Sequence, residues 1–187
     1  MNENGARLRT PAAILETAAR VLADHGDASM NDIAAAAGVG RATVYRHYPT
    51  REALLDALEA DAREQLATRI ADAGLDLVPV PEALGRLLRA IFTVGDRFLV
   101  LRRERTPPPA QPPGETAWRG GAPILALFQR GIDDHTLRDD LSANHLSQLF
   151  GGLVQSALAA GLPRAMGVEQ TAAIIASMFL DGARRRP

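Results

Sequence analysis

Apolar residues recur every three or four positions along most of this chain, which is the spacing of one buried face of an α-helix. The pattern predicts longer helices over residues 10–25, 50–74, 82–104, 115–133, 142–160 and 168–184. Two shorter helices are predicted after the first one, over residues 29–38 and 40–48. No segment alternates apolar and polar residues for long enough to indicate a β-strand. The predicted fold class is therefore all-α.

The ends of the first predicted helices are marked by capping residues. Thr10 followed by Pro11 favours a helix start, and Gly26 favours the end of that helix. Ser29 and Asp32 have the three-residue spacing of a capping box, with Asp in place of the usual Glu. These signals predict a unit of three helices, followed by a long fourth helix.

A domain boundary is predicted inside that fourth helix. Residues 1–55 form the small N-terminal domain, with a flexible arm over residues 1–9, and residues 56–187 form a larger helical body. The arm carries Arg7 and Arg9, so it either reaches a minor groove of DNA or is a disordered tail.

Composition narrows the classes of function. Of the 187 residues, 47% are hydrophobic and 4% are aromatic, which suits a core built from helices. The absence of Cys excludes disulfides and thiolate metal sites. A net charge of −1 does not indicate a nucleic-acid partner, so evidence for DNA binding has to come from a local cluster of basic residues. Without a run of 18 apolar residues or an apolar leader, we expect a cytoplasmic protein with no membrane span.

The short helix predicted over residues 40–48 has a cationic surface. At about 100° per residue, Val44 and Tyr48 lie on the core side, whereas Arg46 points outward. Residues 38–51 contain no Asp or Glu that would balance the basic side chains.

A helix of this kind is suited to the major groove of DNA. Arg41 can bind guanine in a bidentate manner, and the small Ala42 allows close approach or contact with a thymine methyl group. Flanking hydroxyl groups and cations suit phosphates. The predicted DNA-binding residues are Ser29, Arg41, Ala42, Thr43, Tyr45, Arg46, His47 and Arg51. From charge and spacing alone, the alternative is an ordinary solvated helix face.

The glycine, aromatic and charged residues of this region form a specific motif, Ile33-Ala34-x-x-Ala37-Gly38-Val39-Gly40-x-x-Thr43-Val44-Tyr45-x-His47-Tyr48-Pro49-x-Arg51-Glu52-x-Leu54-Leu55. The motif resembles the helix-turn-helix signature of TetR/AcrR-type transcriptional regulators. The preceding segment is similar to that family's first helix, through Ile14-Leu15-x-x-Ala18-x-x-Val21-Leu22-x-x-His25-Gly26. The resemblance covers about residues 8–60. It implies base contacts from Arg41 and Ala42 and backbone contacts from Thr43, Tyr45, His47 and Arg51.

The chain departs from the family's pattern at several positions. Gly40 stands where the family often has Ser, so one capping hydroxyl group is missing, and Met30 stands where Thr or Ser is common. Arg51 replaces the usual Lys and Tyr48 replaces the usual Phe.

A homodimer is predicted because one recognition helix contacts too few bases for useful specificity. The last two predicted helices are apolar on more than one side, and Gly151, Gly152 and Gly182 permit close approach between helices. The resemblance implies the same arrangement. The alternative is that these apolar stripes only close the core of the monomer.

A ligand pocket is predicted among aromatic residues of the helical body, with Phe92, Phe98, Trp118, Phe128 and Phe150 as candidate lining. The alternative is ordinary core, which is the more common role for any one of them. Trp118 follows the Pro-rich segment 106–114, an extended loop where a gate could move. No charged residue stands out inside an apolar helix, so the expected effector is a small apolar or weakly polar molecule.

Other chemistries have little support. Asp133-Asp134-His135, Asp139-Asp140 and His145 fit no standard metal spacing and indicate a solvated acidic loop. The sequence has no nucleophile motif, P-loop or GxGxxG, and no cofactor is expected. The leading hypothesis is a ligand-relieved repressor that binds a palindromic double-stranded DNA operator as a homodimer. The alternative is a dimeric helical small-molecule-binding protein or enzyme with a vestigial helix-turn-helix.

Overall fold

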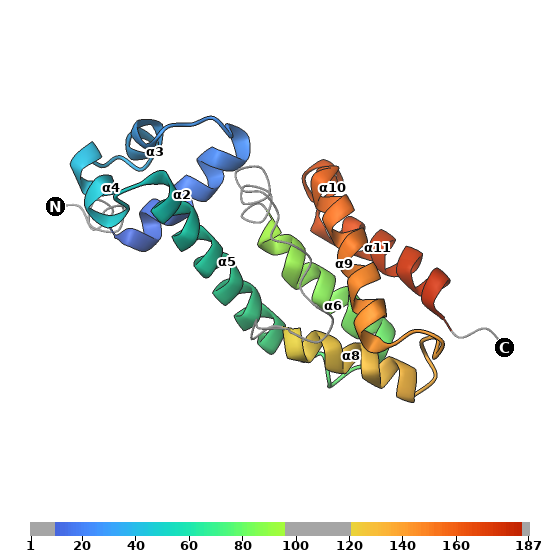
Figure 1. Cartoon of the computed structure of the whole chain (residues 1–187). Helices are drawn as coiled ribbons and strands as arrows, with labels where there is room; N and C mark the ends of the chain where they lie inside the picture. The colour runs from blue at the N-terminus through green and yellow to red at the C-terminus, as the bar shows by residue number, and fades with distance from the viewer. Residues whose placement is uncertain (1–9, 96–120, 185–187) are drawn as a thin grey trace. The chain divides into compact units, whose positions relative to one another are not determined.

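The computed structural model describes residues 10–95 and 121–184, and within these ranges the regular elements are all helices (Figure 1). The all-α prediction is confirmed. Contacts divide the chain into two compact units, and the division falls between Ala62 and Arg63. It lies inside a long helix, α5, which spans Arg51–Asp72. The boundary predicted at residue 55 lies earlier in the same helix.

The N-terminal unit contains α2 (Pro11–Asp24), α3 (Met30–Ala36), α4 (Arg41–His47) and the first part of α5. Capping residues begin these helices where the sequence predicts them. The hydroxyl of Thr10 accepts a hydrogen bond from the Ala13 amide at 3.3 Å, and that of Thr50 accepts one from the Ala53 amide at 3.1 Å. Each cap satisfies a backbone donor that the first helical turn leaves free.

The core of the N-terminal unit is apolar and brings all four helices together. Its fully buried residues recur at helical spacing, and they are Ile14, Ala18, Leu22, Ile33, Val44, Leu54 and Ala62. Val44 comes from α4 and Leu54 from α5, so a short helix with little apolar surface of its own is held by its neighbours.

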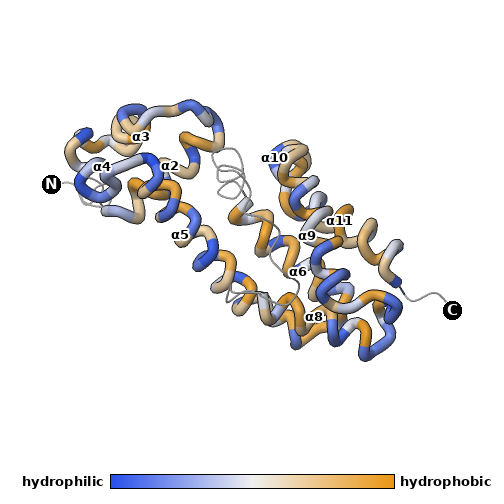
Figure 2. The backbone as a smooth tube through the Cα atoms, in the orientation of Figure 1, coloured by the Kyte–Doolittle hydropathy of each residue, from blue (hydrophilic) through white to orange (hydrophobic). Residues whose placement is uncertain are grey.

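The C-terminal unit contains the rest of α5 together with α6 (Val80–Thr93), α8 (Gly121–Asp133), α9 (Ala143–Ala159), α10 (Leu162–Met166) and α11 (Val168–Ala183). Helix α11 packs against α6 and α9, and α8 packs against α9 and α6. Hydrophobic residues recur along these helices (Figure 2). At the centre of the unit, the rings of Phe128, Phe150 and Phe179 meet edge to face, with centroids 5.2–5.6 Å apart.

Two features of the C-terminal unit differ from the prediction. Helix α6 ends at Thr93, whereas the periodicity predicts a helix to residue 104; the predicted part beyond Gly95 lies outside the described residues. The Val94 amide turns back to the carbonyls of Ile91 and Phe92, which closes the helix. The short α10 was not predicted. It has only five residues, and two glycines with positive φ, Gly161 and Gly167, delimit it.

Several predicted features fall outside the described residues: the arm over 1–9, the Pro-rich segment 106–114 and the first part of the helix predicted over 115–133. Across residues 10–95 and 121–184, no helix combines the length and apolarity needed to cross a membrane.

Candidate DNA-binding surface

Helices α3 and α4 are joined by a tight turn that requires glycine. Gly38 adopts the left-handed conformation with φ of +64°, which glycine tolerates without steric cost. The Val39 amide bonds to the carbonyl of Ala34 and the Gly38 amide to that of Ala35, at 3.0 and 3.1 Å. These two bonds form a Schellman motif, which satisfies the last carbonyls of α3 and turns the chain sharply. The result is the helix-turn-helix connection that the sequence predicts.

The second helix of the motif, α4, presents the predicted side chains to solvent. Val44 is fully buried and Tyr48 is 8% exposed, so both anchor the helix. Arg41, Ala42 and Arg46 are exposed. The partly buried flanking residues are Thr43, Tyr45 and His47. The structure therefore brings most of the predicted DNA-binding residues together on one exposed face of α4.

Two of these residues contact each other. The guanidinium carbon of Arg41 lies 5.2 Å from the ring centroid of Tyr45, at the distance of a cation–π interaction. Because Tyr45 follows Arg41 by about one helical turn, the two side chains are neighbours on the surface of α4. A guanidinium held in this way loses less conformational entropy when it binds a planar acceptor.

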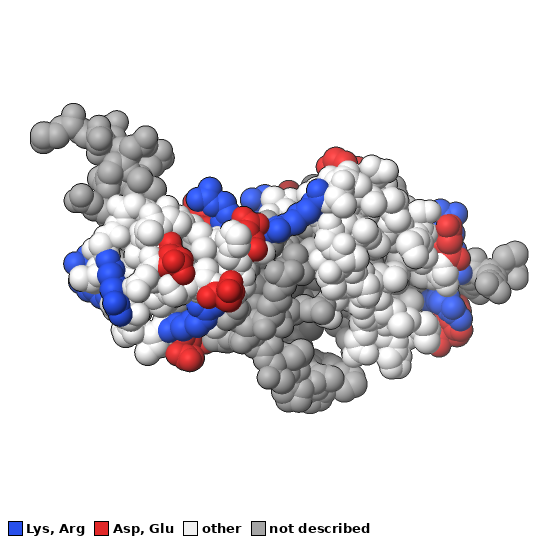
Figure 3. All heavy atoms as spheres, turned by 90° about the horizontal axis from the view of Figure 1, so that it is seen from above, with Lys and Arg blue, Asp and Glu red and all other residues white. Residues whose placement is uncertain are grey.

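The charge of this face is local. Residues 38–51 contain three arginines and no Asp or Glu. Elsewhere the charges are mixed, and Figure 3 shows basic and acidic side chains interspersed on the face in view. The near-zero net charge of the chain therefore coexists with a cationic helix face.

Ser29 caps α3 through the predicted capping box. Its hydroxyl accepts from the Asp32 amide at 3.3 Å and donates to Asp32 Oδ2 at 2.7 Å. The Ser29 amide donates to the same carboxylate oxygen at 2.8 Å. These hydrogen bonds lower the pKa of Asp32, with the side-chain bond from Ser29 as the largest cause. Ser29 remains exposed at the start of the helix.

Arg51 has a structural role that sequence analysis missed. Its Nη1 donates to the carbonyl of Ala28 at 2.6 Å, and its Nη2 donates to the carbonyl of Gly26 at 3.0 Å. The guanidinium thereby ties the start of α5 to the loop between α2 and α3. The acceptors are backbone carbonyls, which every residue has, so no residue type in the sequence indicates these hydrogen bonds. The predicted phosphate contact of Arg51 stays a prediction.

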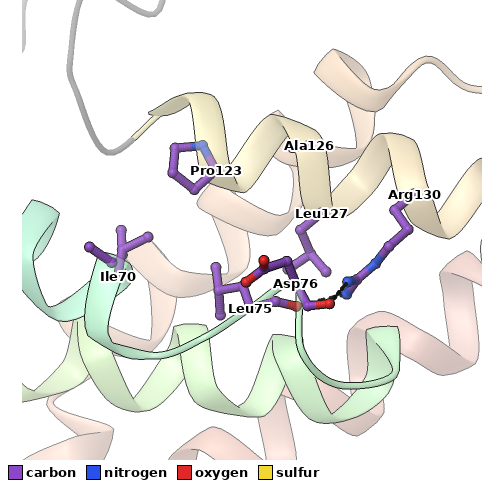
Figure 4. Close-up of a pocket in the computed structure, with 8 residues that line it drawn as sticks. Ile70, Leu75, Asp76, Pro123, Ala126, Leu127 and Arg130 are labelled. Carbon is purple, nitrogen blue, oxygen red and sulfur yellow. Dashed lines mark hydrogen bonds between the residues drawn. The ribbon is translucent and has the colours of Figure 1, made fainter.

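The C-terminal unit contains a pocket of about 350 Å³ at the end of α5 and against α8 (Figure 4). The lining residues are Ile70, Ala71, Leu75, Asp76, Pro123, Ala126, Leu127 and Arg130. The predicted aromatic lining lies elsewhere: Phe92, Phe128 and Phe150 are buried core residues, and Phe98 and Trp118 lie outside the described residues. A pocket lined by these five aromatic residues stays a prediction.

The predicted acidic loop between α8 and α9 carries an ion pair. Arg138 binds Asp140 through two nitrogens, with Nε 2.6 Å from Oδ1 and Nη2 2.5 Å from Oδ2. This hydrogen bonding lowers the pKa of Asp140. Over the described part of the chain, no group of three or more His, Asp or Glu is placed to hold a metal ion.

A helix-turn-helix whose second helix exposes a cationic face is typical of DNA-binding proteins, and it places this chain in that class. Residues 14–58 match the family model described as bacterial regulatory proteins, tetR family. The chain is 40% identical over 158 residues to the HTH-type transcriptional repressor LfrR of Mycolicibacterium smegmatis, an alignment that covers 70% of this chain and 82% of that protein. The chain therefore belongs to the TetR family, and it is a DNA-binding transcriptional regulator.

One further relative and one solved structure of LfrR match nearly the whole chain. The HTH-type transcriptional regulator NfxB of Pseudomonas aeruginosa is 30% identical over 172 residues, which cover 91% of this chain and 92% of NfxB. The crystal structure of LfrR from Mycobacterium smegmatis in complex with proflavine superposes with a TM-score of 0.73 and 31% identity, over 97% of this chain and 99% of that chain. These relatives are transcriptional regulators and not enzymes, so the alternative hypothesis of a helical enzyme is rejected.

Proposed function

We propose that this protein is a repressor that binds a two-fold-symmetric DNA operator as a homodimer and releases it when a small molecule binds. The observation that carries the proposal is the exposed face of α4, where Arg41, Ala42 and Arg46 face solvent in a segment, residues 38–51, that contains no Asp or Glu. The similarity to LfrR, a transcriptional repressor, supports the direction of regulation.

In this proposal some side chains of the helix-turn-helix bind bases and others bind phosphates. Arg41 binds a guanine edge, and Ala42 lets the helix approach the floor of the major groove. Phosphates are held by Ser29, Thr43, Tyr45, Arg46, His47 and Arg51. Phosphate contacts fix the register of the helix, whereas base contacts select the sequence.

The dimer is supported by apolar side chains that the monomer leaves exposed on its last two long helices. Leu149 on α9 is 58% exposed, and Ile174 and Met178 on α11 are 37% and 59% exposed. Gly152 and Gly182 have no neighbouring atom within 4 Å of an added Cβ, so a second copy can approach the backbone closely. An apolar face beside small residues is typical of an interface between identical helices.

Relief by an effector is supported by the proflavine complex of LfrR and by the pocket in the C-terminal unit of this chain. An effector that is small and largely apolar fits the lining, which is mostly aliphatic. Release of DNA requires the effector to bind the DNA-free form more tightly than the DNA-bound form. The body over residues 56–187 would carry both the effector site and the dimer interface.

Fluorescence anisotropy with DNA from upstream of the gene tests the proposal. We expect specific binding that weakens steeply with salt. Arg41→Ala should cost about 1–3 kcal/mol and relax sequence preference at one base pair, whereas Tyr45→Ala should weaken binding to all sequences. Arg69→Ala, which removes an exposed arginine of the C-terminal unit, is the control and should change neither. Binding that lacks specificity, or that is indifferent to both α4 substitutions, would refute the proposal.

A further inference from the structure

A second hollow in the C-terminal unit is lined mainly by polar side chains. It has a volume of about 480 Å³ and is formed by the end of α5, helix α6 and the start of α11. Helix α6 packs against α11 (Figure 1). Six of the nine lining residues are polar, and they are Arg69, Asp72, Arg86, Arg89, Thr93 and Glu169. We call this hollow the arginine groove; the pocket against α8 is lined by different residues.

Arg69 on α5 is exposed and offers its whole guanidinium to the groove. In the parts of the chain that the structure describes, no acceptor bonds to it, and Asp72, three positions further along the helix, does not pair with it. A guanidinium has five N–H donors and stays charged at any physiological pH. Arg69 therefore supplies a full positive charge without a partner inside the described protein.

Arg89 on α6 has only a weak partner. Its Nη1 lies 3.5 Å from Oε2 of Glu169, at the long end of hydrogen-bond distances, and the two side chains are 42% and 78% exposed. Ion pairs this exposed contribute little, because water solvates both charges when they separate. An anion that enters the groove can therefore take the place of Glu169 at Arg89.

Arg86 lies three positions before Arg89, so the two side chains are neighbours on the surface of α6. Its Nη1 donates to the carbonyl of Ala73 at 3.0 Å and its Nη2 donates to Glu82 Oε1 at 2.9 Å. These bonds hold the guanidinium at the end of α5 and still leave it other N–H donors.

The pocket against α8 differs in this respect. There Arg130 donates from Nη1 to the carbonyl of Asp76 at 2.9 Å and from Nη2 to those of Leu75 and Val78 at 2.8 and 3.0 Å. Figure 4 shows this side chain running from α8 to the turn between α5 and α6. Arg130 thus fixes that turn, whereas the arginine groove gathers cations with donors to spare.

We propose that the arginine groove binds a diphosphate group, either free pyrophosphate or the diphosphate of a larger metabolite. One phosphoryl group replaces Glu169 at Arg89, the other accepts from Arg69, and Arg86 binds between them. Planar guanidinium groups match phosphate oxygens in charge and geometry. The groove is separate from the pocket proposed for the effector, and the inference does not rest on that function.

The acids of the groove explain why the ligand has to be multivalent. Asp72 and Glu169 line it together with the three arginines, so the lining carries a net charge of only +1. A monovalent anion gains little over carboxylates that are already in place. A diphosphate carries several negative charges and reaches more than one guanidinium at once, so it outcompetes them.

The groove stays accessible in the proposed homodimer. Glu169 and Met178 are nine positions apart on α11, which at about 100° per residue places them on opposite sides of the helix. Met178 belongs to the exposed apolar face proposed for the interface. A second copy on that face therefore leaves Glu169 and the groove open to solvent.

Isothermal titration calorimetry of the full chain at pH 7, without DNA, phosphate buffer or magnesium, tests the inference. The probes are inorganic pyrophosphate, ADP and inorganic phosphate at equal ionic strength. We expect pyrophosphate to bind about tenfold more tightly than phosphate, because it reaches a second guanidinium. Tighter binding of ADP than of pyrophosphate identifies a diphosphate ester as the ligand, and the reverse order identifies the free anion; either order supports the inference.

Variants of opposite sign separate binding from a structural role. Arg69→Gln and Arg89→Gln should each weaken pyrophosphate binding about tenfold, whereas Glu169→Gln should strengthen it about threefold because it removes the competing carboxylate. Arg20→Gln makes the same change of charge at an exposed site on α2 and should have no effect. Thermal unfolding followed by circular dichroism checks that each variant is folded.

Four results would overturn the inference. They are equal affinity for pyrophosphate and phosphate, weaker binding in Glu169→Gln, an equal loss in Arg20→Gln and Arg69→Gln, and no binding of pyrophosphate or ADP by the folded parent protein.

Discussion

The phenolic hydroxyl of Tyr48 donates a hydrogen bond to the backbone carbonyl of Pro11, with 3.0 Å between the oxygens. This bond joins the end of α4 to the first turn of α2, across 37 residues of sequence. Burial, followed by the negative charge of Asp61, raises the pKa of Tyr48, so its hydroxyl remains a donor at neutral pH. A phenylalanine, which the family more often has at this position, cannot form the bond.

Tyr48→Phe should therefore lower the free energy of unfolding by about 1 kcal/mol, because it removes one hydrogen bond and little apolar surface. Urea denaturation followed by circular dichroism measures the effect. Tyr45→Phe is the matched control: it should leave stability unchanged and weaken operator binding, if its hydroxyl binds a phosphate. The same loss of stability in both variants would contradict the structural role of Tyr48.

Arg51→Lys should destabilise the N-terminal unit although it conserves charge. A lysine ammonium cannot reproduce the planar fork that spans the carbonyls of Gly26 and Ala28, so we expect a loss of about 1.5 kcal/mol in urea denaturation. Arg20→Lys on the exposed side of α2 is the control and should be neutral. Unchanged stability of Arg51→Lys would show that the bridge is dispensable.

The salt dependence of operator affinity tests the separate prediction that Arg51 contacts a phosphate. In Arg51→Met, the slope of log affinity against log salt should decrease by about 1.8 for the dimer if each of its two subunits loses one phosphate contact. A slope equal to that of the parent protein would restrict Arg51 to its structural bridge.

The capping box at α3 should make stability depend on pH in acid. The pKa of Asp32 is lowered below its ordinary value of 3.8 in the folded state, so its stabilising contribution is fully present above that value and is lost as pH falls through the folded pKa. Asp32→Asn should flatten this part of the profile, measured as the urea midpoint between pH 5 and about pH 2. Ser29→Ala should cost about 1 kcal/mol near neutral pH. If the urea midpoint falls with pH in the same way in Asp32→Asn and in the parent protein, ionised Asp32 does not contribute to stability.

The exposed apolar residues of α9 and α11 predict the oligomeric state. Leu149→Asp and Met178→Asp should each convert the dimer to a monomer in light scattering after size exclusion, and should weaken operator binding, because a charge would be buried in the interface. Leu77→Asp is the control, since Leu77 is 78% exposed but lies in the turn between α5 and α6. A parent protein that is already monomeric would refute the interface.

Local signals explain why the N-terminal unit was predictable in detail. Thr10, Ser29 and Gly38 act through bonds to residues within a few positions, so the type and spacing of residues suffice to locate the helix ends. The orientation of α4 followed from helical periodicity alone, and burial of Val44 confirms it.

Features that depend on distant contacts could not be predicted in the same way. The hydrogen bonds by which Arg51 and Arg130 hold distant loops could not be predicted, because their acceptors are backbone carbonyls, which every residue carries. The placement of Asp76 beside Leu127 depends on packing between segments some fifty residues apart. The sequence keeps its apolar period past Thr93, the last residue of α6, so periodicity could not show where the hydrogen bonds of this helix end.

The shortness of α4 limits how much sequence information one subunit can read. Its seven residues extend about 10 Å, which is the length of about three base pairs. Three base pairs distinguish about 64 sequences, and two copies of the helix distinguish about 4,000, far fewer than the roughly 10⁶ competing sites of a genome. We predict that part of the remaining discrimination comes from the bending energy and groove width of the operator, so base pairs that no side chain touches should still alter affinity.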